Sequence, residues 1–261
     1  MTTRREFISS SAALLGTEAI ASPIKSLIGA SETGRIQKDI VIPTPNDYVQ
    51  NGLVCMYDGE WNIDIGQHEN ASKIWYDLCN KRQISLINDA VFEEKCLNTT
   101  TTKPWSSKRS GFPAFITFEA CGFFDSIDTS LGASHVPPLF LVNGNRGLFF
   151  WGTNNTIQYS TYTSTAYGGH GHGQLWDSYP KFHTIGGYNE DNISTTYSDG
   201  YAKKTSFNRQ GPAQNAEYFQ GGGYYGDGIK AKIYNLRFYN RKLSENEIMQ
   251  NYRIDKARFG L

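Results

Sequence analysis

The stretch Lys230-Ala231-Lys232-Ile233-Tyr234-Asn235-Leu236-Arg237-Phe238-Tyr239-Asn240 decides the fold, because it is the best patterned strand in the chain. Successive side chains of a strand point to opposite faces. One face would carry Ile233, Asn235, Arg237 and Tyr239, and the other Tyr234, Leu236, Phe238 and Asn240. Both faces therefore hold apolar groups.

The next segment, Arg241-Lys242-Leu243-Ser244-Glu245-Asn246-Glu247-Ile248, predicts the one convincing helix. Ser244 is a favourable N-cap, and Glu247 stands three residues later, which is the spacing of a capping box. Ile248, Met249 and Tyr252 then follow as its apolar positions. We expect this short helix to pack at a sheet edge or end.

The rest of the chain reads as short strands separated by tight turns. Asx-Gly pairs, which supply the positive φ angles of hairpin turns, occur at 51–52, 58–59, 143–144, 199–200 and 227–228. Besides 230–240, strands are predicted over 53–57, 84–86, 114–122, 138–142, 147–151, 156–161, 181–186, 192–197 and 201–205. Ten short strands indicate an all-β, two-sheet antiparallel sandwich.

Composition narrows the classes of function. The 261 residues include 25 Lys+Arg and 25 Asp+Glu, so the formal net charge is zero, and aromatic residues make up 14%. Nucleic-acid binding needs clustered basic residues, and no basic run exceeds Lys203-Lys204. The same balance disfavours docking on anionic lipid. The length favours one domain with a sizeable core.

The first 21 residues have the layout of a secretory signal peptide: Arg4-Arg5, a weakly apolar stretch, and Ala19-Ile20-Ala21 as a cleavage site. Thr3-Arg4-Arg5-Glu6-Phe7-Ile8 resembles a twin-arginine export signal. An ordinary signal, or a free N-terminus that happens to hold two arginines, is the alternative. The apolar stretch is too short for a membrane span and is broken by Glu18. Residues 22–46 read as a linker and 47–261 as the domain, which we expect to be periplasmic, at the cell surface or secreted.

Cys55, Cys79, Cys96 and Cys121 are too far apart for metal or redox C-x-x-C motifs. In an oxidising compartment they could form disulfides, with three pairings open. A twin-arginine substrate folds before export in a reducing compartment, so the thiols could equally stay free and buried. The sequence leaves both states open.

Two stretches resemble the laminin-G-like branch of the concanavalin A-like lectin/glucanase superfamily. The first is Gly52-Leu53-Val54-Cys55-Met56-Tyr57-Asp58-Gly59 with Trp75-Tyr76-Asp77-Leu78, similar to the family's opening strand and W-x-D-L element. The second is 229–261, similar to its closing strand and short helix. Between them, 183–188 and 197–200 resemble its central hairpin, with Asp199-Gly200 at the tip. The resemblance implies a jelly roll and leaves function open, because this fold hosts lectins, adhesins, hydrolases and spacers.

The resemblance also suggests where chemistry would lie. Glucanases of this superfamily carry an E-x-D-x-x-E strand motif, which none of the 25 acidic residues forms. Relatives often hold Ca²⁺ at the sandwich rim, so Asp58, Asp64 and Asp77 are candidate calcium ligands, although Asp58 could serve its turn and Asp77 could accept backbone N–H groups beside Trp75. His170 and His172 in a Gly-rich segment are too few for zinc and read as a loop.

Sugar rings stack on exposed aromatic side chains, so a glycan site would combine Trp or Tyr with polar neighbours. Aromatic residues in or near predicted loops are the candidates, whereas Trp61 and Trp75 are expected in the core. These candidates are Trp151, Trp176, Tyr179, Tyr224 and Tyr225, with Trp105 as a further loop aromatic. We therefore expect an exported, non-enzymatic carbohydrate-binding or adhesion module. A glycoside hydrolase with a hidden acid pair and a structural or protein-binding spacer are the alternatives.

Overall fold

The predicted closing strand lies inside the larger of the two main sheets. It is β19 (Ile229–Tyr239) in the computed structural model, which describes residues 28–30, 36–38, 41–63, 66–99, 103–127, 138–142, 146–151, 156–161, 181–190, 193–205, 218–222 and 229–260. The chain divides into two units, Met1–Val41 and Ile42–Leu261. Within the first, β1 (Ile28–Ala30) and β2 (Ile36–Lys38) form an antiparallel hairpin. The sandwich belongs to the second unit.

The larger sheet is antiparallel, in the order β17-β16-β15-β11-β19-β9-β8. β9 pairs with the first part of β19, and β3 pairs with the second part, so two short strands share one edge of β19. The bounds are β3 (Leu53–Asp58), β8 (Val91–Phe92), β9 (Leu97–Thr99), β11 (Thr117–Ile127), β15 (Lys181–Glu190), β16 (Ile193–Ser198) and β17 (Tyr201–Thr205).

The smaller sheet is antiparallel in the order β10-β18-β12-β13-β14. Its strands are β10 (Arg109–Ser110), β12 (Pro138–Val142), β13 (Arg146–Trp151), β14 (Thr156–Thr161) and β18 (Tyr218–Gly221). Two small pairs stand apart from both sheets: β4 (Trp61–Ile63) with β5 (Gly66–Gln67), and β6 (Ile74–Tyr76) with β7 (Gln83–Ser85). A 3-10 turn, η1 (Pro45–Asp47), precedes β3.

Aromatic side chains from both sheets form the core between them. The ring centroid of Phe140, from the smaller sheet, lies 5.4 Å from those of Phe118 and Phe238, from the larger, in edge-to-face arrangements. Phe219 stacks on Phe140 at 5.7 Å. Edge-to-face pairs add to the stabilisation that burial itself provides. The predicted all-β sandwich is confirmed.

The prediction that Ile233 shares a face with Asn235 and Arg237 is wrong. Ile233 packs in the intersheet core with Leu236 and Phe238, whereas Asn235 and Arg237 hydrogen-bond to a residue of the helix on the other face. The register with β11 shifts between Cys121 and Gly122, opposite this point. A β-bulge inserts one extra residue, and one extra residue reverses the alternation of faces along the rest of the strand.

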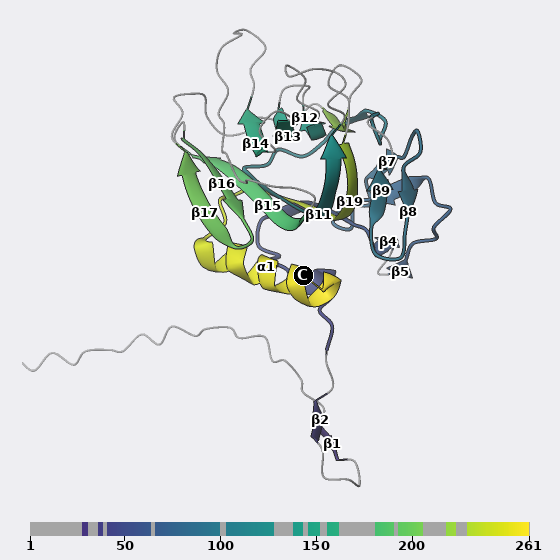
Figure 1. Ribbon diagram of the computed structural model, residues 1–261, viewed down its shortest axis with the longest axis vertical. Helices are drawn as coiled ribbons and strands as arrows, with labels where there is room; N and C mark the ends of the chain where they lie inside the picture. Colours follow the sequence, from purple (N-terminus) through teal and green to yellow (C-terminus); the bar gives the residue numbers. More distant parts are fainter. Residues whose placement is uncertain are drawn as a thin grey trace, which may run out of the picture. The chain divides into compact units, whose positions relative to one another are not determined.

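The predicted helix is α1 (Glu245–Phe259), and its capping box is confirmed: the Ser244 side chain accepts from the Glu247 N–H, and the Glu247 carboxylate accepts from the Ser244 N–H at 2.8 Å. Gly260 ends it at φ 73°. Figure 1 shows α1 on the face of the larger sheet that points away from β12 to β14, so it covers a sheet face and not an edge. No helix in the described ranges is long and apolar enough to cross a bilayer.

Local turn chemistry fixes where β16 ends and β17 begins. Asp199 and Gly200 have φ angles of 50° and 84°, as a type I′ turn requires, and they join β16 to β17. Three predicted strands, 138–142, 156–161 and 201–205, match the structure residue for residue. Several short strands were not predicted: β1 and β2, which lie in the segment predicted as a linker, and β4 to β6, β8 to β10 and β18.

Candidate functional site

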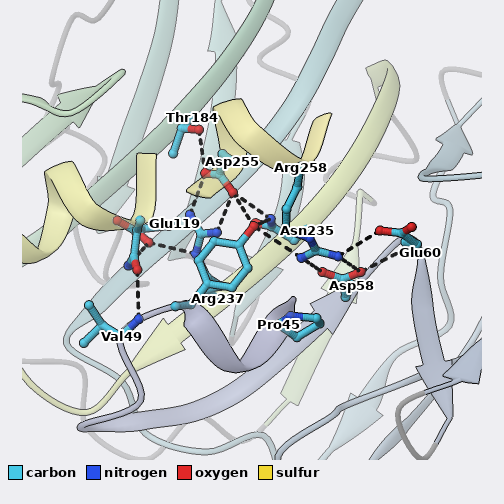
Figure 2. A network of polar contacts seen from close by, with 12 residues as sticks. Pro45, Val49, Asp58, Glu60, Glu119, Thr184, Asn235, Arg237, Asp255 and Arg258 are labelled. Atoms are coloured by element: carbon cyan, nitrogen blue, oxygen red, sulfur yellow. Dashed lines mark hydrogen bonds and ion pairs between the residues drawn. The ribbon is translucent and has the colours of Figure 1, made fainter. Parts of the chain in front are cut away.

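A network of buried charged groups fills the space between the larger sheet and α1 (Figure 2). Arg237 on β19 donates from Nε to Glu119 Oε2 at 2.8 Å. Its Nη1 and Nη2 donate to the two carboxylate oxygens of Asp255 on α1, at 2.7 and 2.8 Å. All three side chains are fully buried. This bidentate geometry is the strongest form of ion pair available to arginine.

A second arginine extends the network toward β3. Arg258 donates to both oxygens of Asp58 at 2.6 and 3.0 Å, and to Glu60 at 3.2 Å. The Tyr48 hydroxyl links the two arginine clusters, because it donates to Asp255 at 2.7 Å and accepts from Arg258 at 3.3 Å. We call this set the α1 network: Tyr48, Asp58, Glu119, Asn235, Arg237, Asp255 and Arg258.

Burial and charge act in opposite directions on the carboxylates of the α1 network. Burial raises the pKa of Glu119, and the attraction of Arg237 only partly offsets it. Burial also raises the pKa of Asp255, but the nearby Arg237 and the hydrogen bonds from Thr184 and Tyr48 outweigh burial and hold this pKa below its usual range. Asp255 is therefore the anion that anchors α1.

Glu119 and Asp255 form an acidic pair in the described residues, since both carboxylates flank the guanidinium of Arg237. Retaining glycosidases need two carboxyls about 5–5.5 Å apart with a sugar between them. Here both acids have no exposed surface, and Arg237 occupies the space between them. This pair is built to hold a helix and gives a sugar no access.

An open cleft of about 570 Å³ lies beside β3, β4 and β6, and we call it the aromatic cleft. Trp61 and Tyr76 are partly exposed in its lining, and Leu53, Met56 and Leu78 add apolar surface. Asn46, Gln50 and Gln83 supply exposed amide groups. Aromatic rings combined with a few polar groups are typical of ligand sites of this size.

Two buried polar side chains shape the aromatic cleft. Asn62 accepts from the Tyr76 N–H at 2.8 Å and donates to the Ile74 carbonyl at 2.9 Å, which joins β4 to β6 and brings Trp61 and Tyr76 to one cleft. Asp77 accepts from the N–H groups of Met56 and Cys79 at 3.0 and 2.9 Å.

The charges in the cleft lining are balanced locally. Arg82 donates to Asp77 Oδ2 at 3.0 Å, so the carboxylate is paired. Burial and the nearby Asp77 raise the pKa of the Cys79 thiol to about 12. The Cys79 thiol is therefore neutral near pH 7. The lining also contains the exposed side chain of Lys81, which is positively charged.

The predicted sugar-stacking residues fall mostly outside the described ranges. This holds for Trp176, Tyr179, Tyr224 and Tyr225, and for the histidine segment around 170–172. Trp151 ends β13, of which the backbone is described. Their role in binding stays a prediction.

Two other tryptophans are placed differently from the prediction. Trp105 is 1% exposed, and its indole N–H donates to the Leu139 carbonyl at 2.7 Å, so it belongs to the core and not to a loop surface. Trp61 is partly exposed in the aromatic cleft and does not lie in the core, whereas Trp75 is buried as predicted. Tyr76 was not singled out from the sequence; the alternation along β6, in which Ile74 and Tyr76 are partly exposed on either side of the buried Trp75, is the signal that could have identified it as a surface residue.

Of the predicted calcium ligands, Asp58 and Asp77 are fully buried and Asp64 lies outside the described residues. Asp58 accepts from the N–H groups of Glu60 and Trp61 within its turn, besides its ion pair with Arg258. Asp58 thus serves its turn and Asp77 accepts backbone N–H groups, which are the structural roles considered for them. In the described ranges, no group of three or more His, Cys, Asp and Glu side chains is arranged to hold a metal ion. Calcium binding stays a prediction. All four cysteines are free thiols, three of them buried and Cys79 exposed.

No known protein-family model matches this sequence, and no curated protein matches it. Solved structures share its fold at low identity. The receptor-binding domain of botulinum neurotoxin type G is 11% identical with a TM-score of 0.56, over 78% of this chain and 51% of that one. A Trypanosoma rangeli sialidase mutant that displays trans-sialidase activity is 16% identical with a TM-score of 0.55, over 83% and 34%.

Trypanosoma rangeli sialidase in complex with sialic acid gives a TM-score of 0.53 at 16% identity, over 86% of this chain and 35% of the sialidase. This chain thus spans about a third of the length of the sialidases that it matches. At these identities the likeness concerns the fold alone. The chain has the all-β sandwich fold found within these sialidases and in the neurotoxin's receptor-binding domain.

Proposed function

We propose that this protein is an exported, non-enzymatic carbohydrate-binding or adhesion module, and that the aromatic cleft binds sugar. The observation that carries the proposal is the pair of partly exposed rings, Trp61 and Tyr76, held in one cleft by the buried amide of Asn62. The fold is compatible with it, because one structural neighbour is a sialidase in complex with sialic acid and another is a receptor-binding domain.

The chemistry of the cleft lining supports a sugar over an apolar ligand. The C–H faces of a pyranose pack on aromatic rings, while its hydroxyl groups need donors and acceptors at the edge. Asn46 and Gln83 provide amide donors and acceptors around Trp61 and Tyr76, and Gln50, whose NH₂ group donates to the Pro45 and Tyr48 carbonyls, provides its amide oxygen as an acceptor. No carboxylate pair faces this cleft among the described lining residues, so binding without cleavage is the expected outcome.

A glycan array of the mature protein, from about residue 22 onward, tests the function directly. The array is run with calcium and again with a chelator, and bound sugars are checked for cleavage. Loss of binding in the chelator would favour the predicted aspartate site at Asp58, Asp64 and Asp77. Cleaved sugar would contradict the non-enzymatic proposal, and silence across a broad array would favour a structural or protein-binding role.

Substitution locates the site. Trp61→Ala should weaken binding by about 1–3 kcal/mol, the cost of losing an anchoring aromatic residue. Tyr201→Ala is the matched control, since Tyr201 is 71% exposed on β17, the opposite edge strand of the larger sheet from β8. Trp151→Ala and Trp176→Ala in the same series test the sites predicted from sequence. If Trp61→Ala binds like the wild type at an unchanged Tm, sugar does not bind in the aromatic cleft.

Export rests on the N-terminal segment. If Arg4-Arg5 forms a twin-arginine signal, replacing both with Lys should hold the protein inside the cell. Continued export of this variant would mean that another signal directs the chain.

A further inference from the structure

The aromatic cleft and the α1 network share one short segment of chain. Pro45, Asn46 and Gln50 line the cleft, and Tyr48 and Val49, which lie between them, are buried on the other side. The segment 45–50 is therefore a wall with two faces. One face lines the cleft and the other is fixed to α1.

Hydrogen bonds attach the wall to α1 and to the neighbouring strand β19. The Tyr48 hydroxyl donates to Asp255 on α1 at 2.7 Å and accepts from Asn235 at 3.1 Å. The Val49 N–H donates to Asn251 Oδ1 at 3.0 Å, and Gln250 donates from its side chain to the Asp47 carbonyl at 3.2 Å. Pairs of residues about 200 positions apart thus hold the wall to the helix.

Apolar packing connects the helix to the floor of the cleft as well. Tyr48, Met56 and Ile254 form one buried cluster, with Leu53 and Leu78 packed against it. Met56, Leu53 and Leu78 are also lining residues of the cleft. Ile254 of α1 therefore belongs to the cluster that forms the cleft floor, and the Tyr48 ring lies 4.2 Å from the Arg237 guanidinium.

We infer that α1 positions the wall of the aromatic cleft through Tyr48, so that docking of the helix and the ligand-competent shape of the cleft are linked equilibria. A molecule bound in the cleft stabilises the docked helix, and release of the helix weakens binding by the same factor, because coupling between two sites is reciprocal. Tyr48 is a positioning residue that acts through the wall. The inference rests on the proposed function for what the cleft binds, but the coupling is measurable without a sugar.

Cys79 provides that measurement. Its thiol lines the cleft and is the exposed one, while the thiols of Cys55, Cys96 and Cys121 are buried. In the full-length chain, N-ethylmaleimide modification of each cysteine is followed by mass spectrometry in the wild type and in Tyr48→Phe. This variant keeps the ring and removes the hydroxyl that bonds to Asp255.

Loosening of the wall should reduce the partial burial that raises the pKa of the Cys79 thiol, so its modification rate should rise about fivefold or more, the lower end of the usual range of coupling, while the other three thiols stay protected. Thr99→Val is the matched control. It also removes a buried hydroxyl, which donates to the Ile229 carbonyl at 2.7 Å, but it lies on β9, away from the wall. Gln250→Ala, an exposed change that removes the contact with Asp47, replaces Tyr48→Phe if that variant does not fold.

An unchanged Cys79 rate in Tyr48→Phe would overturn the inference. So would an equal rise in Thr99→Val, or a joint rise of all four thiols, since each would reflect loss of global stability. These outcomes do not depend on the glycan array. A cleft that fails to bind sugar but still opens in Tyr48→Phe would refute the proposed function and leave the coupling intact.

Discussion

Asp255→Asn should cost this domain a large part of its stability. The carboxylate of Asp255 accepts five hydrogen bonds, from Tyr48, Thr184 and Asn235 and two from Arg237. Asparagine has the same shape, but an NH₂ group takes the place of one carboxylate oxygen. That NH₂ group would face an N–H or O–H group that donates a hydrogen bond to the oxygen in the wild type. Among the residues that the structure describes, Glu119 would then be the one charged partner left to Arg237.

The magnitude follows from the burial of the pair. Removing one partner of a fully buried ion pair costs about 3–5 kcal/mol, because the remaining charge is left without compensation. For a domain of about 200 residues this corresponds to a fall in Tm of about 6–20 °C. Since small domains are stable by about 5–15 kcal/mol, the variant would be folded but marginal.

Urea unfolding of both proteins at pH 7, followed by circular dichroism and by tryptophan fluorescence, measures the loss. Glu245→Gln is the control, because it removes a charge from an exposed position of the same helix and should change stability by less than about 0.5 kcal/mol. A loss below about 1 kcal/mol for Asp255→Asn would refute the view that the charge of Asp255 anchors α1.

Three further predictions concern other parts of the domain. Arg241 lowers the pKa of Glu247 from 4.5 to about 2, so the stabilisation from Glu247 is complete above about pH 4.5 and lost as the pH falls toward 2. The variant Glu247→Gln should therefore lower the free energy of unfolding by about 1 kcal/mol at pH 7 and leave it unchanged near pH 2. Urea unfolding at a series of pH values measures this difference. A Cβ on Gly186 would overlap the Tyr197 ring, so Gly186→Ala should lower the free energy of unfolding by about 1–3 kcal/mol or more. At Gly111 the space is open but φ is 72°, so Gly111→Ala should lower it by about 1 kcal/mol or less. Equal falls in Tm for the two variants would contradict this. In denaturant without reductant, a thiol assay should find all four cysteines free, and a lower count would reveal a disulfide.

The sequence was most informative where local chemistry alone determines structure. The capping box of Ser244 and Glu247 places the start of α1, and Asp199-Gly200 places a hairpin, because both depend on residues only a few positions apart. The bulge in β19 could not be read in the same way. It is defined by the register with β11, more than 100 residues away, and it moves Ile233 to the opposite face.

The candidate site escaped prediction for a related reason. Trp61 reads like any core tryptophan, and only the packing of β4 beside β6 leaves its ring partly exposed. The α1 network was equally hidden, since Glu119, Arg237 and Asp255 lie on three separate elements. A charged residue is almost always exposed unless it is paired, so the sequence favours exposure for all three. Their ion pairs join segments that are distant in sequence and form only in the folded chain.

The central position of β19 also determines the order in which the domain can assemble. β19 pairs with β11 on one side and with β3 and β9 on the other, so the larger sheet cannot close until residues 229–239 have been synthesised. Tyr48 must then meet Asp255 across 207 residues of sequence. Contacts so distant in sequence carry a large loop-closure entropy and make folding slow. We expect earlier strands to wait as unpaired edges, so a nascent chain that stops before β19 should be prone to aggregation and the complete chain should fold as one late event.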